Sequence, residues 1–349
     1  MVPKKLVVLD FDEPRLLENK IFNPAEAIKV SHTILPTCYL QRQAALLGIA
    51  MVTPDVYLRG RPLPALMLSH LHTSWTKRLI GAGARPIILT CQESPFIATR
   101  FYANLKNYSG LYKHSFVFAG MRKRLSSKTQ YRQMFFPQAY NPAVIAEVPF
   151  GQRKFLTMIS GNKRMGNWKK TLLIKFMYGW GIKEIYSLRQ RVINLMATRG
   201  GFDLYGVGWD RGGLNPGDTS NIKKVYRGKV DDKTETLRQY KFAFCFENSV
   251  FPGYVTEKIF DVMFAGCVPV YNGAPDIKNF VPAGAFIDVR DFSGLDRLAE
   301  FLENMDESVY NRYMANIKKY LASPEFLKFS QENFAENILG ILEQEFNNE

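Results

Sequence analysis

The feature that most constrains the fold is the alternation of short apolar runs with helix-like segments. The runs in the first part of the chain are LVVLDF (6–11), IAMVT (49–53), ALMLSH (65–70), PIILTC (86–91) and SFVFAG (115–120). They are rich in Val, Ile, Leu and Phe on both faces, as strands of a parallel sheet are when helices cover both sides. Residues 37–47 and 74–82 have helical patterns. The alternation predicts an α/β fold with a parallel sheet.

This pattern stops at residues 141–151, where NPAVIAEVPFG has two prolines and no clear period. A second series follows, with strands expected at 154–160, 202–208, 241–246, 267–271 and 286–289, helices at 186–198 and from about 257, and a Gly-rich loop at 210–221. A chain of 349 residues fits two domains. We expect α/β domains over 1–150 and 151–349, with an amphipathic C-terminal helix that can pack back on the first. Two such domains with a cleft between them suit an enzyme with two substrates.

Several classes of protein are disfavoured by the sequence. The chain has no run of about 18 apolar residues, which a membrane-spanning helix would need. Asp10 and Asp12 close the first apolar run, so we expect a strand there and not a signal peptide. The four cysteines lie in apolar surroundings, which is typical of buried thiols in a reducing compartment, and only His70 and His72 form a close histidine pair. The sequence predicts a cytoplasmic protein with no metal site.

The charge of the chain favours an anionic partner. Lys and Arg number 46 against 32 acids, which gives a formal net charge of +14. Nucleic acid, an anionic membrane face and a pyrophosphate substrate would all fit such a charge. The densest basic stretch, residues 152–170, is either a solvated face or a surface that meets phosphates or membrane.

The most informative segment is residues 240–292. A buried strand ends in a polar group at 247–249, and Thr256 is suited to cap a following helix. Lys258 lies in the first turn of that helix, where a cation opposes the helix dipole. Its position makes sense if an anion binds at the same helix end. The alternative is that Lys258 points into water and pairs with Glu257 or Asp261.

This segment resembles the donor-binding motif of the α-1,3/1,4-fucosyltransferases, glycosyltransferase family 10, in the bacterial type without a membrane anchor. The family pattern has a Tyr-Lys-Phe strand, Phe-Glu-Asn, a short loop, Tyr-(Val/Ile)-Thr-Glu-Lys before a helix, and Val-Pro-Val with a Gly loop. The matching residues here are Tyr240, Lys241, Phe242, Phe246, Glu247, Asn248, Tyr254, Val255, Thr256, Glu257, Lys258, Val268, Pro269, Val270 and Gly273. The resemblance implies a glycosyltransferase B fold: two Rossmann-like domains, the C-terminal one holding GDP-fucose and the N-terminal one the acceptor.

The resemblance also assigns donor contacts. It implies that Asn248 and Tyr254 contact the nucleotide, Glu257 the fucose or ribose hydroxyls, and Lys258 the pyrophosphate, with Glu247 in the same site.

A family arginine upstream of this motif also binds the pyrophosphate. The stretch YSLRQRVINLM (186–196) falls in the right place, with Arg189 as the first choice and Arg191 as the second.

The N-terminal half resembles the family at one patch, CQESP (91–95). Family members place a general base in a similar Glu-Ser-Pro context, which makes Glu93 the candidate. Its position after the strand PIILT supports that role, because ligands bind at the carboxyl ends of such strands. The alternative is a loop glutamate that caps the next helix. Asp10, Asp12 and Glu13 follow the first strand and are the next candidates.

The implied reaction is an inverting transfer of L-fucose from GDP-fucose to a glycan hydroxyl. The expected acceptors are GlcNAc or Glc units, attacked at the 3-position, on an oligosaccharide or a glycolipid such as lipopolysaccharide. No cofactor or protein-bound metal is expected, and the chain would contact an anionic inner membrane peripherally. The rival hypotheses are a transferase that uses another GDP-sugar, a catalytically dead nucleotide-sugar binder, and a basic nucleic-acid-binding protein. The last lacks any nucleic-acid recognition signature in the sequence.

Overall fold

The structure is a computed structural model that describes residues 5–60, 63–139, 148–163, 168–179, 181–210 and 219–348. The chain divides into two compact units. Unit 1 comprises Met1–Tyr140 together with Leu327–Glu349, and unit 2 comprises Asn141–Phe326. The sequence places the junction at residues 150–151. Leu327–Glu349 is grouped with the first unit, on which the sequence allows the C-terminal helix to pack back.

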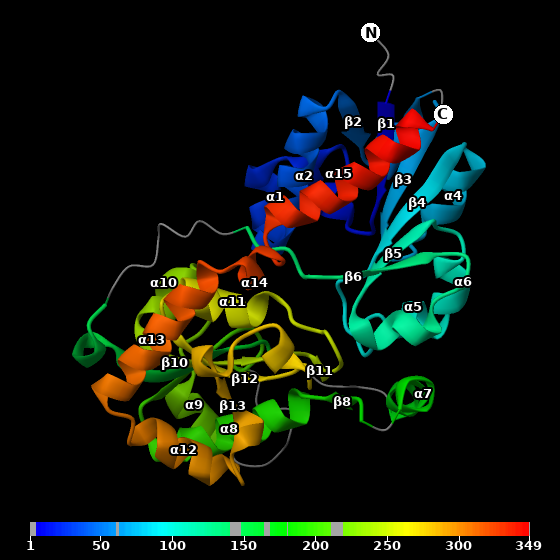
Figure 1. Ribbon diagram of the computed structural model, residues 1–349. Helices are drawn as coiled ribbons and strands as arrows, with labels where there is room; N and C mark the ends of the chain where they lie inside the picture. The colour runs from blue at the N-terminus through cyan, green and yellow to red at the C-terminus, as the bar shows by residue number, and fades with distance from the viewer. Residues whose placement is uncertain are drawn as a thin grey trace. The chain divides into compact units, whose positions relative to one another are not determined.

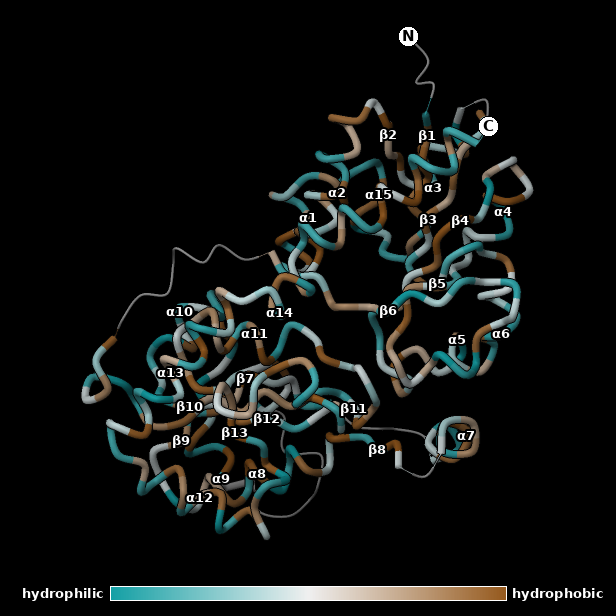
Figure 2. Tube along the Cα trace, in the orientation of Figure 1, coloured by the Kyte–Doolittle hydropathy of each residue, from teal (hydrophilic) through white to brown (hydrophobic). Residues whose placement is uncertain are grey.

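Unit 1 is built on a six-stranded parallel sheet with the order β2-β1-β3-β4-β5-β6 (Figure 1). The strands are β1 (Lys5–Asp10), β2 (Ile49–Val52), β3 (Ala65–His70), β4 (Ala84–Thr90), β5 (His114–Val117) and β6 (Gln130–Gln133). Hydrophobic residues dominate β3 and β4, as Figure 2 shows. Burial of these strands on both faces explains their continuous apolar sequences.

Helices pack around this sheet. Those of unit 1 are α1 (Pro24–Val30), α2 (Leu35–Leu46), α3 (Pro54–Arg59), α4 (Thr76–Gly81), α5 (Thr99–Ala103), α6 (Leu105–Ser109) and α15 (Gln331–Asn347). The C-terminal helix α15 lies against α2, with Ile338 and Leu342 fully buried. Glu345 on the same helix pairs with Lys113 beside β5. The chain therefore returns to its first unit after completing the second.

Unit 2 has a five-stranded parallel sheet with the order β13-β12-β10-β7-β9. Its strands are β7 (Lys154–Ile159), β9 (Phe202–Tyr205), β10 (Tyr240–Phe246), β12 (Val268–Asn272) and β13 (Ile287–Asp288). The short strands β8 (Lys183–Glu184) and β11 (Ser249–Val250) form a separate antiparallel pair. The helices are α7 (Trp168–Tyr178), α8 (Tyr186–Arg199), α9 (Thr219–Val225), α10 (Lys233–Arg238), α11 (Glu257–Phe264), α12 (Leu295–Glu303), α13 (Glu307–Leu321) and α14 (Pro324–Leu327), which ends at the unit boundary.

The α/β class and the ten strands expected from the sequence are confirmed. The edge strand β6 is absent from the prediction because its sequence QYRQ is polar and partly exposed. All four cysteines are free and buried, as expected. Among the described residues, no helix is long and apolar enough to cross a membrane. Most of the Gly-rich loop at 210–221 lies outside the described residues.

Candidate functional site

A cavity of about 280 Å³ lies in unit 2 at the carboxyl ends of β7 and β10, where ligands of parallel α/β sheets bind. Its wall comes from the end of β7 and the residues that follow it, the end of β10, α11, two residues of α10 and one residue of α8. Four described lining residues are cationic and one is acidic, and these are Lys163, Arg189, Lys233, Lys258 and Glu257. The excess of positive charge suits an anionic ligand.

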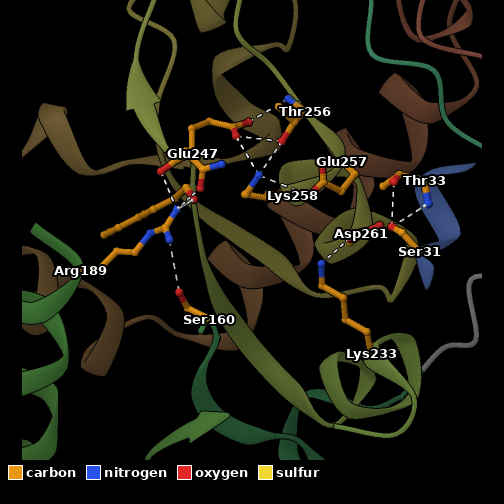
Figure 3. A network of polar contacts seen from close by, with 12 residues as sticks. Ser31, Thr33, Ser160, Arg189, Lys233, Glu247, Thr256, Glu257, Lys258 and Asp261 are labelled. Carbon is orange, nitrogen blue, oxygen red and sulfur yellow. Dashed lines mark hydrogen bonds and ion pairs between the residues drawn. The ribbon is translucent and has the colours of Figure 1, made fainter. Parts of the chain in front are cut away.

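The buried carboxylate of Glu247 organises one wall of this cavity. It follows the last residue of β10 and is fully inaccessible to solvent. Its Oε1 accepts a hydrogen bond from the Thr256 amide, and its Oε2 accepts one from the Thr256 hydroxyl, both at 2.8 Å. Burial raises the pKa of Glu247, and the nearby Lys258 ammonium opposes that shift. Glu247 therefore joins the end of β10 to the start of α11 (Figure 3).

Gly273 explains why the motif needs a glycine after β12. A Cβ built there would lie 2.4 Å from Cγ of Glu247 and 2.3 Å from the Tyr271 hydroxyl. Both distances are far below van der Waals contact, so a side chain would displace the buried carboxylate.

Thr256 precedes α11 as expected, but its side chain does not cap the helix. Its hydroxyl donates to Glu247 and accepts from Lys258 Nζ at 2.9 Å. The first amides of α11 thus have no side-chain cap from the described residues, and the positive end of the helix dipole is open to a ligand.

Lys258 lines the cavity and also pairs with neighbouring carboxylates. Its Nζ lies 3.2 Å from carboxylate oxygens of both Glu247 and Glu257, and it also lines the cavity. Burial alone would lower the pKa of Lys258, but the two carboxylates outweigh burial and raise it. The lysine therefore stays charged. Glu257 stays ionised as well, because Lys258 and Lys233 lower its pKa against the opposing effect of burial.

Arg189 projects from α8 into the same cavity and is buried. Its Nη2 donates to the carbonyl oxygens of Phe246 and Glu247, both at 2.6 Å, and to Oδ1 of Asn248 at 3.2 Å. Its Nη1 donates to Ser160 Oγ at 3.3 Å (Figure 3). Burial lowers the pKa of the guanidinium, although an arginine remains protonated at neutral pH. The side chain therefore ties together the strand ends on both sides of the cavity.

The other expected donor residues differ in their placement. Asn248 lines the cavity. Tyr254 is buried and is not among the described residues that line the cavity. Arg191 is exposed on α8 and also lies outside the lining.

Two lining cations lie outside the expected donor set. Lys233 begins α10 and pairs with Asp261 on α11, while Lys163 follows β7. Neither falls in the motif of 240–273. The signal for Lys163 was its place in the basic stretch 152–170, whereas nothing in the local sequence separates Lys233 from other surface lysines.

A second cavity, of about 290 Å³, lies in unit 1 and contains Glu93. Its lining is largely apolar, with Asp12, Glu13, His70 and Thr90 among the polar members. Glu93 follows β4, and its backbone carbonyl accepts from the Tyr102 hydroxyl at 2.8 Å. Of the reserve candidates, Asp12 and Glu13 share this cavity, whereas Asp10 is fully buried and accepts hydrogen bonds from Ser69, Thr73 and Thr76.

Metal binding has no support in the described part of the chain, which contains no group of three or more His, Cys, Asp and Glu side chains able to hold an ion.

Residues 169–338 match the C-terminal domain of glycosyltransferase family 10 (fucosyltransferase). The C-terminal half of this chain is thus similar to glycosyltransferase family 10. The Helicobacter pylori protein alpha-(1,3)-fucosyltransferase FucT is 44% identical over 84 residues, which are 24% of this chain and 17% of that protein. Human alpha-(1,3)-fucosyltransferase 7 is 46% identical over 83 residues, or 23% of this chain and 24% of its own length. The chain thus matches less than a quarter of the length of these relatives.

Solved structures extend the likeness from the C-terminal half to the fold of the chain. A crystal structure of an alpha1,3-fucosyltransferase with GDP-fucose has a TM-score of 0.55 at 16% identity and covers 98% of this chain and 90% of its own. The Anabaena protein Alr3699/HepE in complex with UDP has a TM-score of 0.59 at 10% identity and covers 97% and 100%. The glycosyltransferase B class expected from the sequence is confirmed.

The family 10 motif thus corresponds to a physical cluster. Glu257, Lys258 and Asn248 meet Arg189 at one cavity, although Arg189 lies far from them in the sequence. Glu247 and Tyr254 are buried and are not among the described residues that line this cavity. Glu93 lies in the other unit, in a cavity of its own.

Proposed function

We propose that this chain is an α-1,3-fucosyltransferase that moves L-fucose from GDP-fucose to a hydroxyl of a glycan acceptor. The observation that carries the proposal is the cationic cavity of unit 2, in which motif residues Asn248, Glu257 and Lys258 meet Arg189. The names of the family 10 relatives and the GDP-fucose in a structural neighbour support the choice of donor.

In this proposal the pyrophosphate of the donor occupies the cationic wall. Lys258 and the open amino end of α11 face its negative charge, and Lys163 and Lys233 add to the positive field. Glu257, held ionised between two lysines, accepts hydrogen bonds from sugar hydroxyls. Charge on the pyrophosphate grows as its bond to fucose breaks, so these cations stabilise the transition state more than the bound donor.

The acceptor side of the reaction is assigned to Glu93. Its carboxylate takes the proton of the acceptor hydroxyl, whose oxygen attacks the anomeric carbon on the face opposite GDP. The bond between that carbon and the phosphate oxygen breaks, and its electron pair leaves with GDP. The β-linked donor thus gives an α-fucoside. The acceptor we propose is a GlcNAc or Glc unit of an oligosaccharide or glycolipid, such as lipopolysaccharide.

Isothermal titration calorimetry tests the donor, with GDP, GDP-fucose, GDP-mannose and UDP-glucose as ligands. UDP-glucose is the sharpest control, because a protein of similar fold has been solved with it. We expect GDP and GDP-fucose to bind much more tightly than UDP-glucose. Equal binding of UDP-glucose would refute the donor, and preference for GDP-mannose would indicate a transferase for another GDP-sugar. Mass spectrometry of a GlcNAc acceptor incubated with GDP-fucose then separates a transferase from a donor-binding protein without activity.

A further inference from the structure

Helix α7 (Trp168–Tyr178) of unit 2 exposes large apolar side chains to solvent. Phe176 is 84% exposed, Trp168 71%, Leu172 49% and Leu173 43%, while Ile174 is the one buried residue of the helix. At about 100° per residue, the four exposed side chains fall within an arc of roughly 140° on one side of the helix. Apolar side chains clustered in this way mark an interaction surface, in contrast to single exposed ones.

Three lysines accompany this apolar arc. Lys175 lies about 20° outside one end of the arc and Lys170 about 60° outside the other, at about 100° per residue. Lys169 lies within the arc beside Trp168, with its ammonium 5.8 Å from the centre of the indole ring. The helix sequence WKKTLLIKFMY contains no acidic residue. Figure 2 shows hydrophobic and hydrophilic residues interspersed along α7. Exposed apolar side chains interspersed with lysines suit contact with an anionic lipid surface, because lysine stems can lie along apolar surface while their ammonium groups stay in water.

We propose that α7 is an interfacial anchor that inserts its apolar face into an anionic phospholipid bilayer. Charge complementarity selects this occupant, because α7 carries three lysines and no acidic residue in a chain of net charge +14, and anionic lipids attract such segments. Trp168 is suited to the boundary between headgroups and acyl chains, where its amphipathic ring is favoured. The 11 residues of α7 extend for about 16 Å, which allows the helix to lie along the surface and not to cross it.

The anchor is connected through the fold of unit 2 to the cationic cavity of that unit, which we call the donor cavity because it is the proposed site of GDP-fucose. The strand β8, which follows α7, pairs with β11, and β11 begins directly after Asn248 of the cavity wall. A membrane-bound α7 would therefore hold the donor site close to the lipid surface. The anchor itself does not depend on which nucleotide sugar binds.

Vesicle co-sedimentation of the full chain tests the anchor. The probes are vesicles of pure phosphatidylcholine and vesicles that contain about 30 mol% phosphatidylglycerol. The apolar variant Leu172→Gln/Phe176→Gln has the matched control Ile28→Gln/Leu46→Gln, which changes two residues that are also exposed, 57% and 79%. The charge variant Lys169→Gln/Lys170→Gln/Lys175→Gln has the control Lys223→Gln/Lys318→Gln/Lys319→Gln, so both remove three positive charges from exposed or half-exposed positions.

We expect the wild-type chain to sediment with the anionic vesicles, more weakly with neutral ones, and less as salt screens the lysines. Each α7 variant should lose roughly tenfold or more in partitioning, while both control variants keep the wild-type level. Failure of the wild type to bind anionic vesicles, or equal losses in α7 and control variants, would overturn the proposal. If the apolar variant binds vesicles normally but changes the oligomeric state in analytical ultracentrifugation, the face is instead an interface between copies of this chain. Calorimetry with GDP on the same variants keeps this test separate from that of the donor.

Discussion

At the scale of single residues, Arg189 has two functions that a substitution would remove together. Its guanidinium satisfies two carbonyl oxygens at the end of β10 and also lines the donor cavity. We expect Arg189→Ala to weaken GDP binding about ten- to hundredfold, since charged hydrogen bonds contribute roughly 1.5–3 kcal/mol. It should also lower the free energy of unfolding by about 1–3 kcal/mol, because buried carbonyls lose their partner.

Arg191→Ala is the matched control for this experiment, because it removes an exposed arginine from the same helix. Calorimetry with GDP and thermal unfolding would measure the two effects. If Arg191→Ala weakens GDP binding and Arg189→Ala does not, the assignment of the pyrophosphate arginine is wrong by two positions.

Glu93 is the candidate base, and its conservative variant isolates the proton transfer. Glu93→Gln keeps the shape of the side chain but removes the proton acceptor, so the transfer rate should fall by roughly 10²–10⁴-fold. GDP binding should be unchanged, because the donor cavity belongs to the other unit. Asp12→Asn and Glu13→Gln are the controls, since both residues line the cavity of Glu93. Normal turnover in Glu93→Gln, with loss in either control, would move the base to that residue.

His70 makes unit 1 sensitive to acid. It ends β3, and burial lowers its pKa from 6.5 to about 4. The unfolded chain therefore binds this proton more readily than the folded chain does. The stabilisation of the folded state that comes from the neutral His70 side chain is fully present above pH 6.5 and is lost as the pH falls toward 4. In His70→Asn, the decrease in unfolding free energy over that window should be smaller by on the order of 2 kcal/mol. Urea titrations at several pH values would measure the unfolding free energy of each variant. If it depends on pH in His70→Asn as it does in the exposed-site control His32→Asn, the acid sensitivity does not come from His70.

At the scale of elements, the sequence predicts the buried strands and misses the partly exposed one. Strands such as β3 and β10 are mostly apolar, and their positions are predicted within about two residues. The strand β6 is stabilised by pairing with β5 and has no such pattern. The role of Lys233 is likewise not predictable from the sequence, because this residue lines the cavity only through the packing of α10 on α11. Tertiary contacts of this kind leave no local signal.

The carboxyl edge of the second sheet has a specific requirement for glycine at the end of β9. Gly206 has φ = 131°, and a Cβ there would lie 2.1 Å from the carbonyl oxygen of Ser160, which lines the donor cavity. Gly206→Ala should therefore lower the free energy of unfolding by several kcal/mol, about 3 or more, and weaken GDP binding as Ser160 moves. Gly151→Ala is the control, since the space around Gly151 is open and its φ is ordinary. Denaturant unfolding and calorimetry would test this, and a fully stable Gly206→Ala would show that the approach of β9 to β7 is looser than described.

At the scale of the whole molecule, the sequence allows the C-terminal helix to pack back on the first domain but does not give the surface that it covers. The amphipathic pattern of 331–347 predicts a helix, but the surface it covers depends on contacts with α2 about 300 residues earlier in the sequence. The resemblance to family 10 is strongest in unit 2 and extends to residue 338 by sequence. The sequence match ends at residue 338, whereas unit 2 ends at Phe326. The two ends differ because the match follows similarity of sequence and the unit is defined by packing.

This difference leads to a prediction that separates the two units. Leu342 on α15 and Leu302 on α12 are both buried, the first in unit 1 and the second in unit 2. Truncation of either to Ala should cost about 2–5 kcal/mol. Hydrogen exchange measured by mass spectrometry should then show faster exchange in β1–β6 for Leu342→Ala and in the sheet of β7 and β10 for Leu302→Ala. GDP binding should be preserved in the first variant and weakened in the second, because only the second loosens the unit that holds the donor cavity. If Leu342→Ala instead increases exchange throughout the chain and weakens GDP binding equally, the two units unfold as one cooperative body, and the stability of the donor site depends on a helix that belongs to the other unit.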